Sequence, residues 1–209
     1  MNNFDLHTPT RILFGKGAIE KLREQIPAEA RVLITYGGGS VKKTGVLDQV
    51  LTALNGLDVL EFGGIEPNPS YETLMNAVKL AREEKVTFLL AVGGGSVLDG
   101  TKFIAAAAHY DAAIDPWEIL ETYGSKIASA IPMGSVLTLP ATGSESNKGA
   151  VISRKTTGDK RAFMSSHVQP QFAILDPVYT YTLPPRQVAN GVVDAFVHTV
   201  EQYVTYPVD

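Results

Sequence analysis

Two side chains near the end of the sequence have the types and the spacing of metal ligands. Asp194 and His198 lie four residues apart in a stretch with helical character, so both project from one face of that helix. A carboxylate and an imidazole placed in this way can hold one divalent cation. The same spacing also fits a plain Asp–His pair on a helix surface, which contributes roughly a few tenths of a kcal/mol. The remaining histidines, His7, His109 and His167, have no recognisable ligand context, so the sequence predicts an incomplete metal site.

A second feature that could bind a ligand is the tetrapeptide Gly-Gly-Gly-Ser, which occurs at residues 37–40 and again at residues 93–96. Each copy follows an apolar run that predicts a buried strand and precedes a run that predicts a helix. Such a turn leaves backbone N–H groups open to an anion such as a pyrophosphate, and the helix dipole favours negative charge there. The fingerprint G-x-G-x-x-G is not met, because Leu98 stands at the third glycine position, and a glycine turn is also common as plain architecture. Ser96 and Asp99 have the spacing of a capping box.

Strands and helices that alternate along the chain must position these residues. We expect a strand or hairpin over residues 4–14 and further strands at 31–36, 58–62, 88–92, 136–140, 150–153 and 172–175. Helices are expected at 18–25, 46–54, 70–84 with Ser70 as its cap, and over the Ala-rich segment after residue 96. This order predicts an α/β fold with a Rossmann-like, mostly parallel sheet, helices on both faces, and ligands at the carboxyl ends of the strands.

The pattern changes at Thr182. Pro184 and Pro185 mark a helix start, and residues 185–205 then read as one helix with no strand signal after it. We therefore divide the chain into an α/β dinucleotide-binding domain at 1–181 and the first helix of an α-helical C-terminal domain at 182–209.

Composition narrows the class of protein. The chain has 209 residues, of which 44% are hydrophobic and 19% charged, as in a globular protein with an ample core. The net charge of −4 gives no basic footprint, so nucleic acid is not expected as a partner. No apolar run is long enough for a membrane span, and residues 1–7 lack the features of a signal peptide, so a cytoplasmic location is expected. The absence of cysteine excludes disulfides and thiolate metal sites.

Five motifs in order carry a resemblance to a known family: Gly93-Gly-Gly-Ser96-x-x-Asp99-x-x-Lys102, Leu139-Pro-Ala-Thr-Gly143-Ser-Glu145, Asp176-Pro177, Leu183-Pro184, and Gly191-x-x-Asp194-x-x-x-His198-x-x-Glu201. This series resembles the signature of the iron-dependent (group III) alcohol dehydrogenases, and the resemblance covers essentially the whole chain. It implies a metal-containing, nicotinamide-dependent oxidoreductase that reduces aldehydes to alcohols. It also implies a divalent metal, Fe²⁺ or Zn²⁺, in the cleft between the dinucleotide domain and a helical domain.

The resemblance implies roles for particular residues. Asp194 and His198 would be the first two metal ligands, and the family's two further histidines come from a part of the helical domain that lies beyond Asp209. Backbone N–H groups at residues 94–96 would hold the pyrophosphate. Thr138 and Thr142 would line the adenine and nicotinamide side, and Lys160 would meet phosphate or ribose oxygens. The cofactor-binding residues predicted in this way are Gly37, Gly38, Gly39, Ser40, Asn68, Gly94, Gly95, Ser96, Asp99, Thr138, Thr142, Asn147 and Lys160.

Two questions stay open at this stage. Asp99 could serve the nicotinamide ribose or amide, or could only close the capping box. The choice of cofactor can be argued from charge, because an NAD site places a carboxylate near the adenine ribose. The turn after residue 36 has no carboxylate and is followed by Lys42 and Lys43, which favours NADP(H), although a solvated basic turn gives the same pattern.

The sequence supports three hypotheses about function. The first is NADPH-dependent, metal-assisted reduction of small aldehydes by the complete enzyme. The second is an NADP(H)-binding domain without catalysis, because two ligands alone hold a metal weakly. The third is a folding or assembly unit. In each case the apolar face of helix 185–205 needs a cover, which a second copy in a homo-oligomer or a C-terminal domain could provide.

Overall fold

The computed structural model describes residues 7–205, so residues 4–6 of the predicted first strand and residues 206–209 of the predicted second domain lie outside the described part. The elements, in chain order, are β1 (Arg11–Phe14), η1 (Ala18–Lys21), η2 (Arg23–Gln25), β2 (Arg31–Tyr36), α1 (Ser40–Lys43), α2 (Val46–Ala53), β3 (Asp58–Phe62), α3 (Tyr71–Glu83), β4 (Phe88–Gly94), α4 (Gly95–His109), α5 (Glu118–Glu121), β5 (Met133–Leu139), β6 (Gly149–Arg154), β7 (Asp159–Met164), η3 (Ser166–Val168), β8 (Phe172–Leu175), η4 (Pro177–Thr180) and α6 (Pro185–Thr205).

Six strands form one sheet in the order β1-β8-β5-β4-β2-β3, and every neighbouring pair is parallel. The predicted α/β class with a parallel, Rossmann-like sheet is therefore confirmed. The strands β4 and β2 are neighbours in this sheet, with β4 at its centre and Tyr36 of β2 opposite Val92 of β4. Both are almost wholly apolar, as expected for strands that are covered on both faces.

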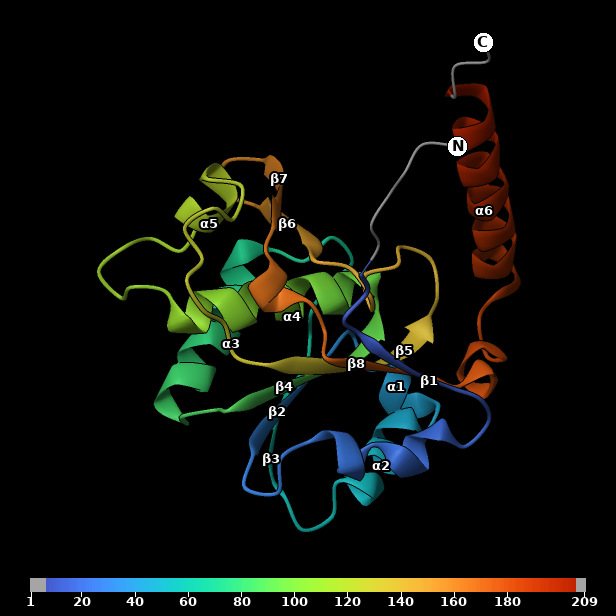
Figure 1. Ribbon diagram of the computed structural model, residues 1–209, viewed down its shortest axis with the longest axis horizontal. Helices are drawn as coiled ribbons and strands as arrows, with labels where there is room; N and C mark the ends of the chain where they lie inside the picture. Colours follow the sequence, from blue (N-terminus) through green and yellow to red (C-terminus); the bar gives the residue numbers. More distant parts are fainter. Residues whose placement is uncertain (1–6, 206–209) are drawn as a thin grey trace.

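The side chains of β4 alternate between two hydrophobic cores. Leu89 and Ala91 pack into one core with α3, α4 and α5, whereas Phe88, Leu90 and Val92 pack into the other with η1, α1 and α2. Figure 1 shows the corresponding layers, with α4 and α5 on one side of the sheet and α2 on the other. Helices on both faces, as predicted, leave the ends of the strands as the place where loops can meet a ligand.

Two local predictions were wrong. The segment Ala18–Gln25 forms two short 3₁₀ turns in place of one helix, and these still direct its apolar residues Ile19 and Leu22 into the core. The strand β7 was not predicted, because its sequence Asp-Lys-Arg-Ala-Phe-Met has a single buried side chain, Phe163, and no apolar alternation. It pairs with β6 in a separate antiparallel hairpin.

The predicted helix after Thr182 is present as α6, which stands apart from the sheet in Figure 1. None of its residues is buried, and the large apolar side chains Phe196 and Tyr203 are 68% and 83% exposed. The division into domains at residue 182 stays a prediction, as does any oligomeric state. Within residues 7–205 no helix combines the length and the apolar character that crossing a membrane requires.

Candidate nucleotide site and metal half-site

The two glycine turns leave the sheet side by side. Because Tyr36 pairs with Val92, residues 37–40, which follow β2, and residues 93–96, which form the end of β4 and the start of α4, lie at the same level of the sheet. The helices that follow them lie on opposite faces, with α1 and α2 in one core and α4 in the other. Adjacent strands whose connections diverge in this way open a crevice at their carboxyl ends, where open α/β sheets bind ligands.

Close packing explains why glycine is needed in the second turn. A Cβ atom added to Gly95 would lie 2.5 Å from the hydroxyl oxygen of Thr142, and one added to Gly93 would lie 2.7 Å from a methyl carbon of Val97. In the first turn Gly39 has a φ of 100°, a conformation that side chains disfavour, while Gly38 faces open space. The turn at residues 93–96 is therefore packed against the loop that follows β5, and the turn at residues 37–40 is open at Gly38 and Gly39.

The predicted capping box of Ser96 and Asp99 is not formed. The strand β4 continues into Gly94, which has an extended conformation, so α4 begins at Gly95 and no side chain caps it. Ser96 therefore lies inside the first turn, where its hydroxyl accepts a hydrogen bond from the backbone N–H of Asn68 at 3.3 Å. The N–H groups of the first turn of α4, a helix of 15 residues, have no side-chain cap and suit an anion.

The carboxylate of Asp99 is turned toward the segment after β5. It accepts hydrogen bonds from the Ser144 hydroxyl at 2.7 Å and from the Val151 N–H at 3.0 Å. Burial raises the pKa of Asp99, and these two hydrogen bonds oppose that rise. The capping role that we left open for Asp99 is excluded by this geometry, and its service to the nicotinamide stays a prediction.

A buried lysine, Lys102, holds the same segment and was not among the predicted site residues. Its ammonium group donates to the Ser144 hydroxyl at 2.9 Å, to the Asn147 side-chain oxygen at 2.8 Å and to the Gly149 carbonyl at 2.8 Å. Burial lowers the pKa of Lys102 to about 8, against the opposing effect of the carboxylates of Asp99 and Glu145. The sequence signal for this role was the motif Asp-x-x-Lys, which places both groups on one face of α4.

The hairpin β6–β7 brings Lys160 to the same edge. The ammonium group of Lys160 donates to the Asn68 side-chain oxygen at 2.8 Å, and Asn68 itself has a φ of 56° and contacts Ser96. At the turn of the hairpin, Lys155 donates to the Glu66 carboxylate at 2.7 Å, which fastens the hairpin to the loop before α3. The structure thus unites Asn68, Ser96 and Lys160, three residues predicted from separate parts of the chain.

The first glycine turn has a charged neighbour that the sequence argument did not include. The turn itself has no carboxylate, but Glu61 of β3 reaches the ammonium group of Lys42 at 3.5 Å. The same carboxylate accepts from the Tyr36 hydroxyl at 3.0 Å, and Lys42 lies 4.9 Å above the Tyr36 ring. The carboxylate of Glu61 therefore lies next to the turn, although it belongs to the adjacent strand β3, and it is already paired with the ammonium group of Lys42.

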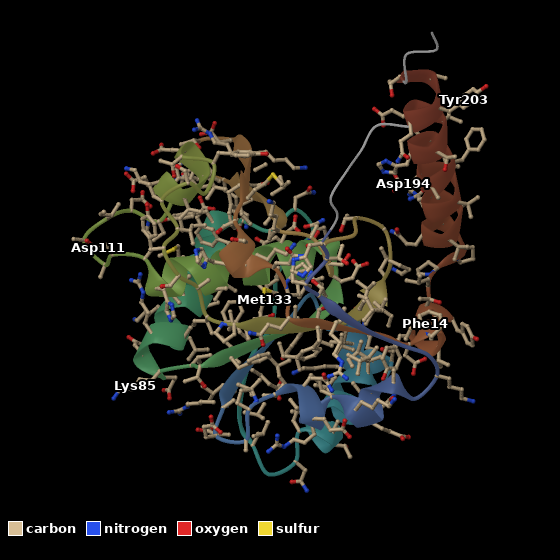
Figure 2. The ribbon with its side chains drawn as sticks, in the orientation of Figure 1. Phe14, Lys85, Asp111, Met133, Asp194 and Tyr203 are labelled. Atoms are coloured by element: carbon tan, nitrogen blue, oxygen red, sulfur yellow. The ribbon has the colours of Figure 1, made fainter. Side chains whose placement is uncertain are left out.

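The two predicted metal ligands lie on α6. The His198 Nε2 atom is 3.6 Å from an Asp194 carboxylate oxygen, and the two side chains are 63% and 53% exposed. Asp194 also lines a cleft of about 520 Å³ between α6 and the end of β5, together with Leu139 and Ala141. Figure 2 shows Asp194 on this detached helix. Among the described residues 7–205, no three His, Cys, Asp or Glu side chains come together as a potential metal site.

Comparison with known proteins identifies the family. The model of the iron-containing alcohol dehydrogenases matches residues 9–177. The chain belongs to this family. It is 86% identical over 209 residues to the NADPH-dependent aldehyde reductase YqhD of Escherichia coli K12, covering 100% of this chain and 54% of that protein. It is 47% identical over 208 residues to the NADP-dependent alcohol dehydrogenase 3 of Entamoeba histolytica, covering 98% of this chain and 54% of the relative.

Solved structures of the family agree with the fold. A crystal structure of the E. coli protein superimposes with a TM-score of 0.95, covering 100% of this chain and 53% of that one. The NADH-dependent butanol dehydrogenase A of Thermotoga maritima, 42% identical, gives a TM-score of 0.89 and covers 96% and 51%. The chain spans about half the length of the curated relatives it matches.

Proposed function

We propose that this chain supplies the NADP(H)-binding half, and the first two metal ligands, of an enzyme that reduces small aldehydes to alcohols. The observation that carries the proposal is the pair of glycine turns at the ends of the neighbouring strands β2 and β4, together with the N-terminus of α4, which has no side-chain cap. The names of the relatives support it, since YqhD is an NADPH-dependent aldehyde reductase and the family consists of alcohol dehydrogenases.

The predicted cofactor residues have distinct tasks in this proposal. The backbone N–H groups of Gly94, Gly95 and Ser96 bind the pyrophosphate, which the first turn of α4 can accept because it has no side-chain cap. The packing of Thr142 against Gly95 forms the wall on the β5 side, where Thr138 also lies. When bound, the reduced nicotinamide supplies the hydride for the aldehyde carbon.

The opposite wall belongs to Asn68 and Lys160, whose side chains already meet at 2.8 Å. Lys160 contributes positive charge toward phosphate or ribose oxygens. The turn at Gly37, Gly38, Gly39 and Ser40 faces the adenine ribose. Its open space at Gly38 leaves room for a 2′-phosphate, and Lys43 supplies positive charge for NADP(H), whereas Lys42 is paired with the carboxylate of Glu61.

The residues on α6 fit a divalent metal as part of a coordination shell. Asp194 offers oxygen and His198 offers nitrogen, a set that suits Fe²⁺ or Zn²⁺, and their separation of 3.6 Å allows both to face one ion. A metal held there supplies Lewis-acid polarisation of the carbonyl oxygen. Asp194 lines the cleft between α6 and the end of β5, next to the loop that carries Thr142.

A second function, NADP(H) binding without turnover, is favoured for this chain on its own by one observation. The described residues contain two of the ligands that the family reading requires and no cluster of three. Two protein ligands give weak, exchangeable metal binding. We therefore expect cofactor binding that does not depend on added metal, and little or no aldehyde reduction by this chain alone.

A fluorescence titration of NADPH and NADH into the purified chain, with and without Zn²⁺ or Fe²⁺, tests the proposal. We expect NADPH to bind more tightly than NADH and equally well without metal. The variant Ser40→Asp places a carboxylate in the first turn, and like-charge contact with the 2′-phosphate should weaken NADPH binding by about tenfold or more while sparing NADH. Failure of both nucleotides to bind would refute the cofactor assignment, and robust aldehyde reduction would refute the second function.

A further inference from the structure

The buried lysine of α4, Lys102, uses all of its hydrogen-bond donors on one stretch of the chain. An ammonium group has three N–H donors, and Lys102 uses them on Ser144, Asn147 and Gly149 at 2.8–2.9 Å. Ser144 and Asn147 lie in the segment between β5 and β6, and Gly149 is the first residue of β6. Lys102 itself is fully buried, with an exposed fraction of 0%.

Asp99 holds the same segment three residues earlier on the helix. The hydroxyl of Ser144 accepts from Lys102 and donates to Asp99, so this serine is held from both sides by α4. The second carboxylate oxygen of Asp99 accepts from the N–H of Val151, at the start of the hairpin. One face of α4 therefore fixes the backbone from residue 144 to residue 151.

Stability alone does not account for a lysine at this position. Burying an ammonium group has a large desolvation cost, and an apolar side chain of similar volume is often neutral or stabilising in its place. The neighbours of Lys102 on α4, Phe103 and Thr101 among them, are fully buried without charge. What the lysine adds is a fixed geometry for a loop that carries Thr142, which faces Gly95, and Asn147.

We propose that Lys102 is a positioning residue of the nucleotide site, whose ammonium group holds the loop at residues 140–149 against the first turn of α4. The loop then forms the wall of the crevice with Thr142 and Asn147 in place before the nucleotide arrives. This inference rests on the proposed function for the role of that wall. Without the ammonium group, the loop is released and each nucleotide that binds must order it again.

The test replaces Lys102 by methionine, which keeps most of the volume and removes the donors. Lys79→Met is the matched control, because Lys79 lies on the neighbouring helix α3 with its side chain 74% exposed. We expect Lys102→Met to weaken NADPH binding by about tenfold, the equivalent of ordering about one backbone residue. Amide hydrogen exchange at residues 141–149 should accelerate in the same variant, and Lys79→Met should change neither quantity.

A pH series separates positioning from a merely structural role. Burial places the pKa of Lys102 near 8, and the charged groups that act on it are Asp99 on its own helix and Glu145 in the loop. As the pH rises from 7 to 9.5, the ammonium group loses a proton and one donor. The affinity of the unaltered chain and of Lys79→Met for NADPH should therefore fall through this range, while that of Lys102→Met stays level.

A folded Lys102→Met variant with unchanged NADPH affinity and unchanged loop protection overturns the proposal, as does a level pH profile in the unaltered chain. If circular dichroism shows that Lys102→Met does not fold, Ser144→Ala removes one acceptor and must accelerate loop exchange to a smaller degree. If the unaltered chain binds no NADPH, the proposed function fails, and the exchange of the loop in Lys102→Met still shows whether the lysine holds it.

Discussion

The helices α4 and α6 carry the two halves of the proposed site, and they differ in how they are packed. Ten of the 15 residues of α4 are buried, whereas none of the 21 residues of α6 is. The first helix lies between the sheet, α3 and the hairpin, and the second stands beside the body of the protein (Figure 1). The cofactor half is therefore fixed by packing within this chain, and the metal half is not.

The difference lies in what covers each apolar face. The run of alanines in α4 lets the helix approach its neighbours closely, and its side chains belong to a single core. In α6 the valines and Phe196 alternate with polar residues at helical spacing, yet they meet solvent. An apolar stripe of this kind indicates that the helix packs against a partner. No residue from 7 to 205 covers the stripe, so the position of α6 depends on that partner.

The largest effect that separates the two helices is expected from removing a phenylalanine ring in each. Phe103 on α4 is fully buried, so Phe103→Ala should lower the free energy of unfolding by about 3–5 kcal/mol. Phe196 on α6 is 68% exposed, and Phe196→Ala should change it by less than about 0.5 kcal/mol. Urea unfolding followed by circular dichroism measures both.

Similar losses of stability in the two phenylalanine variants would contradict the difference in packing between α4 and α6. In that case the face of α6 is covered in solution, and the stability of Phe196→Ala should then depend on protein concentration if the cover is a second copy. A loss that does not change with concentration would place α6 against the body of its own chain.

The same substitution of glycine by alanine should have opposite effects in the two helices. At Gly95 the new methyl group would lie 2.5 Å from Thr142, so the loop must move, which costs about 1–3 kcal/mol and weakens NADPH binding. At Gly191 nothing lies within 4 Å, and Gly191→Ala should stabilise α6 by up to about 1 kcal/mol. Nucleotide titration and urea unfolding of both variants check this, and unimpaired NADPH binding by Gly95→Ala would remove the glycine turn from the site.

Most strands of the sheet could be predicted from the sequence, because an apolar run bounded by turn residues is a local pattern that needs no knowledge of distant contacts. The same holds for the cap of α3, where the Ser70 hydroxyl accepts from the N–H of Thr73. The sequence did not predict where α4 begins, since the spacing of Ser96 and Asp99 fits a capping box in any helix that starts after Ser96. The motif Asp-x-x-Lys drew attention to Lys102, but its partners could not be predicted, because they lie more than 40 residues along the chain and only the fold brings them to it.

A smaller effect is expected from the carboxylate that fastens the hairpin. Burial would raise the pKa of Glu66, but hydrogen bonds from Lys155, Ser70 and Thr73 lower it to about 2. Its contribution to stability is therefore present above the ordinary value near 4.5 and is lost as the pH falls from there toward 2. Glu66→Gln should cost about 1 kcal/mol at pH 7, since solvent screens a partly exposed group.

Urea unfolding of the Glu66→Gln variant and the unaltered chain at pH 7, 4 and 2.5 tests this dependence. The difference between the two proteins should shrink toward the lowest pH, because the unfolded chain binds a proton at Glu66 below about pH 4.5 while the folded chain binds it only near pH 2. A difference that stays constant with pH would mean that the side chain acts through its shape and not through its charge.

The smallest effect is expected at the metal half-site itself. His198→Ala removes an exposed i, i+4 pair with Asp194, which is worth about 0.2–0.5 kcal/mol, and gains a similar amount from the helix propensity of alanine. The two contributions nearly cancel, so the free energy of unfolding should stay within about 0.5 kcal/mol of the unaltered chain in urea. A loss above about 1 kcal/mol would show that the pair is buried in an assembly. A result near zero would mean that the stability of α6 does not depend on the pair, which agrees with the proposal that Asp194 and His198 serve as metal ligands and not as a structural contact.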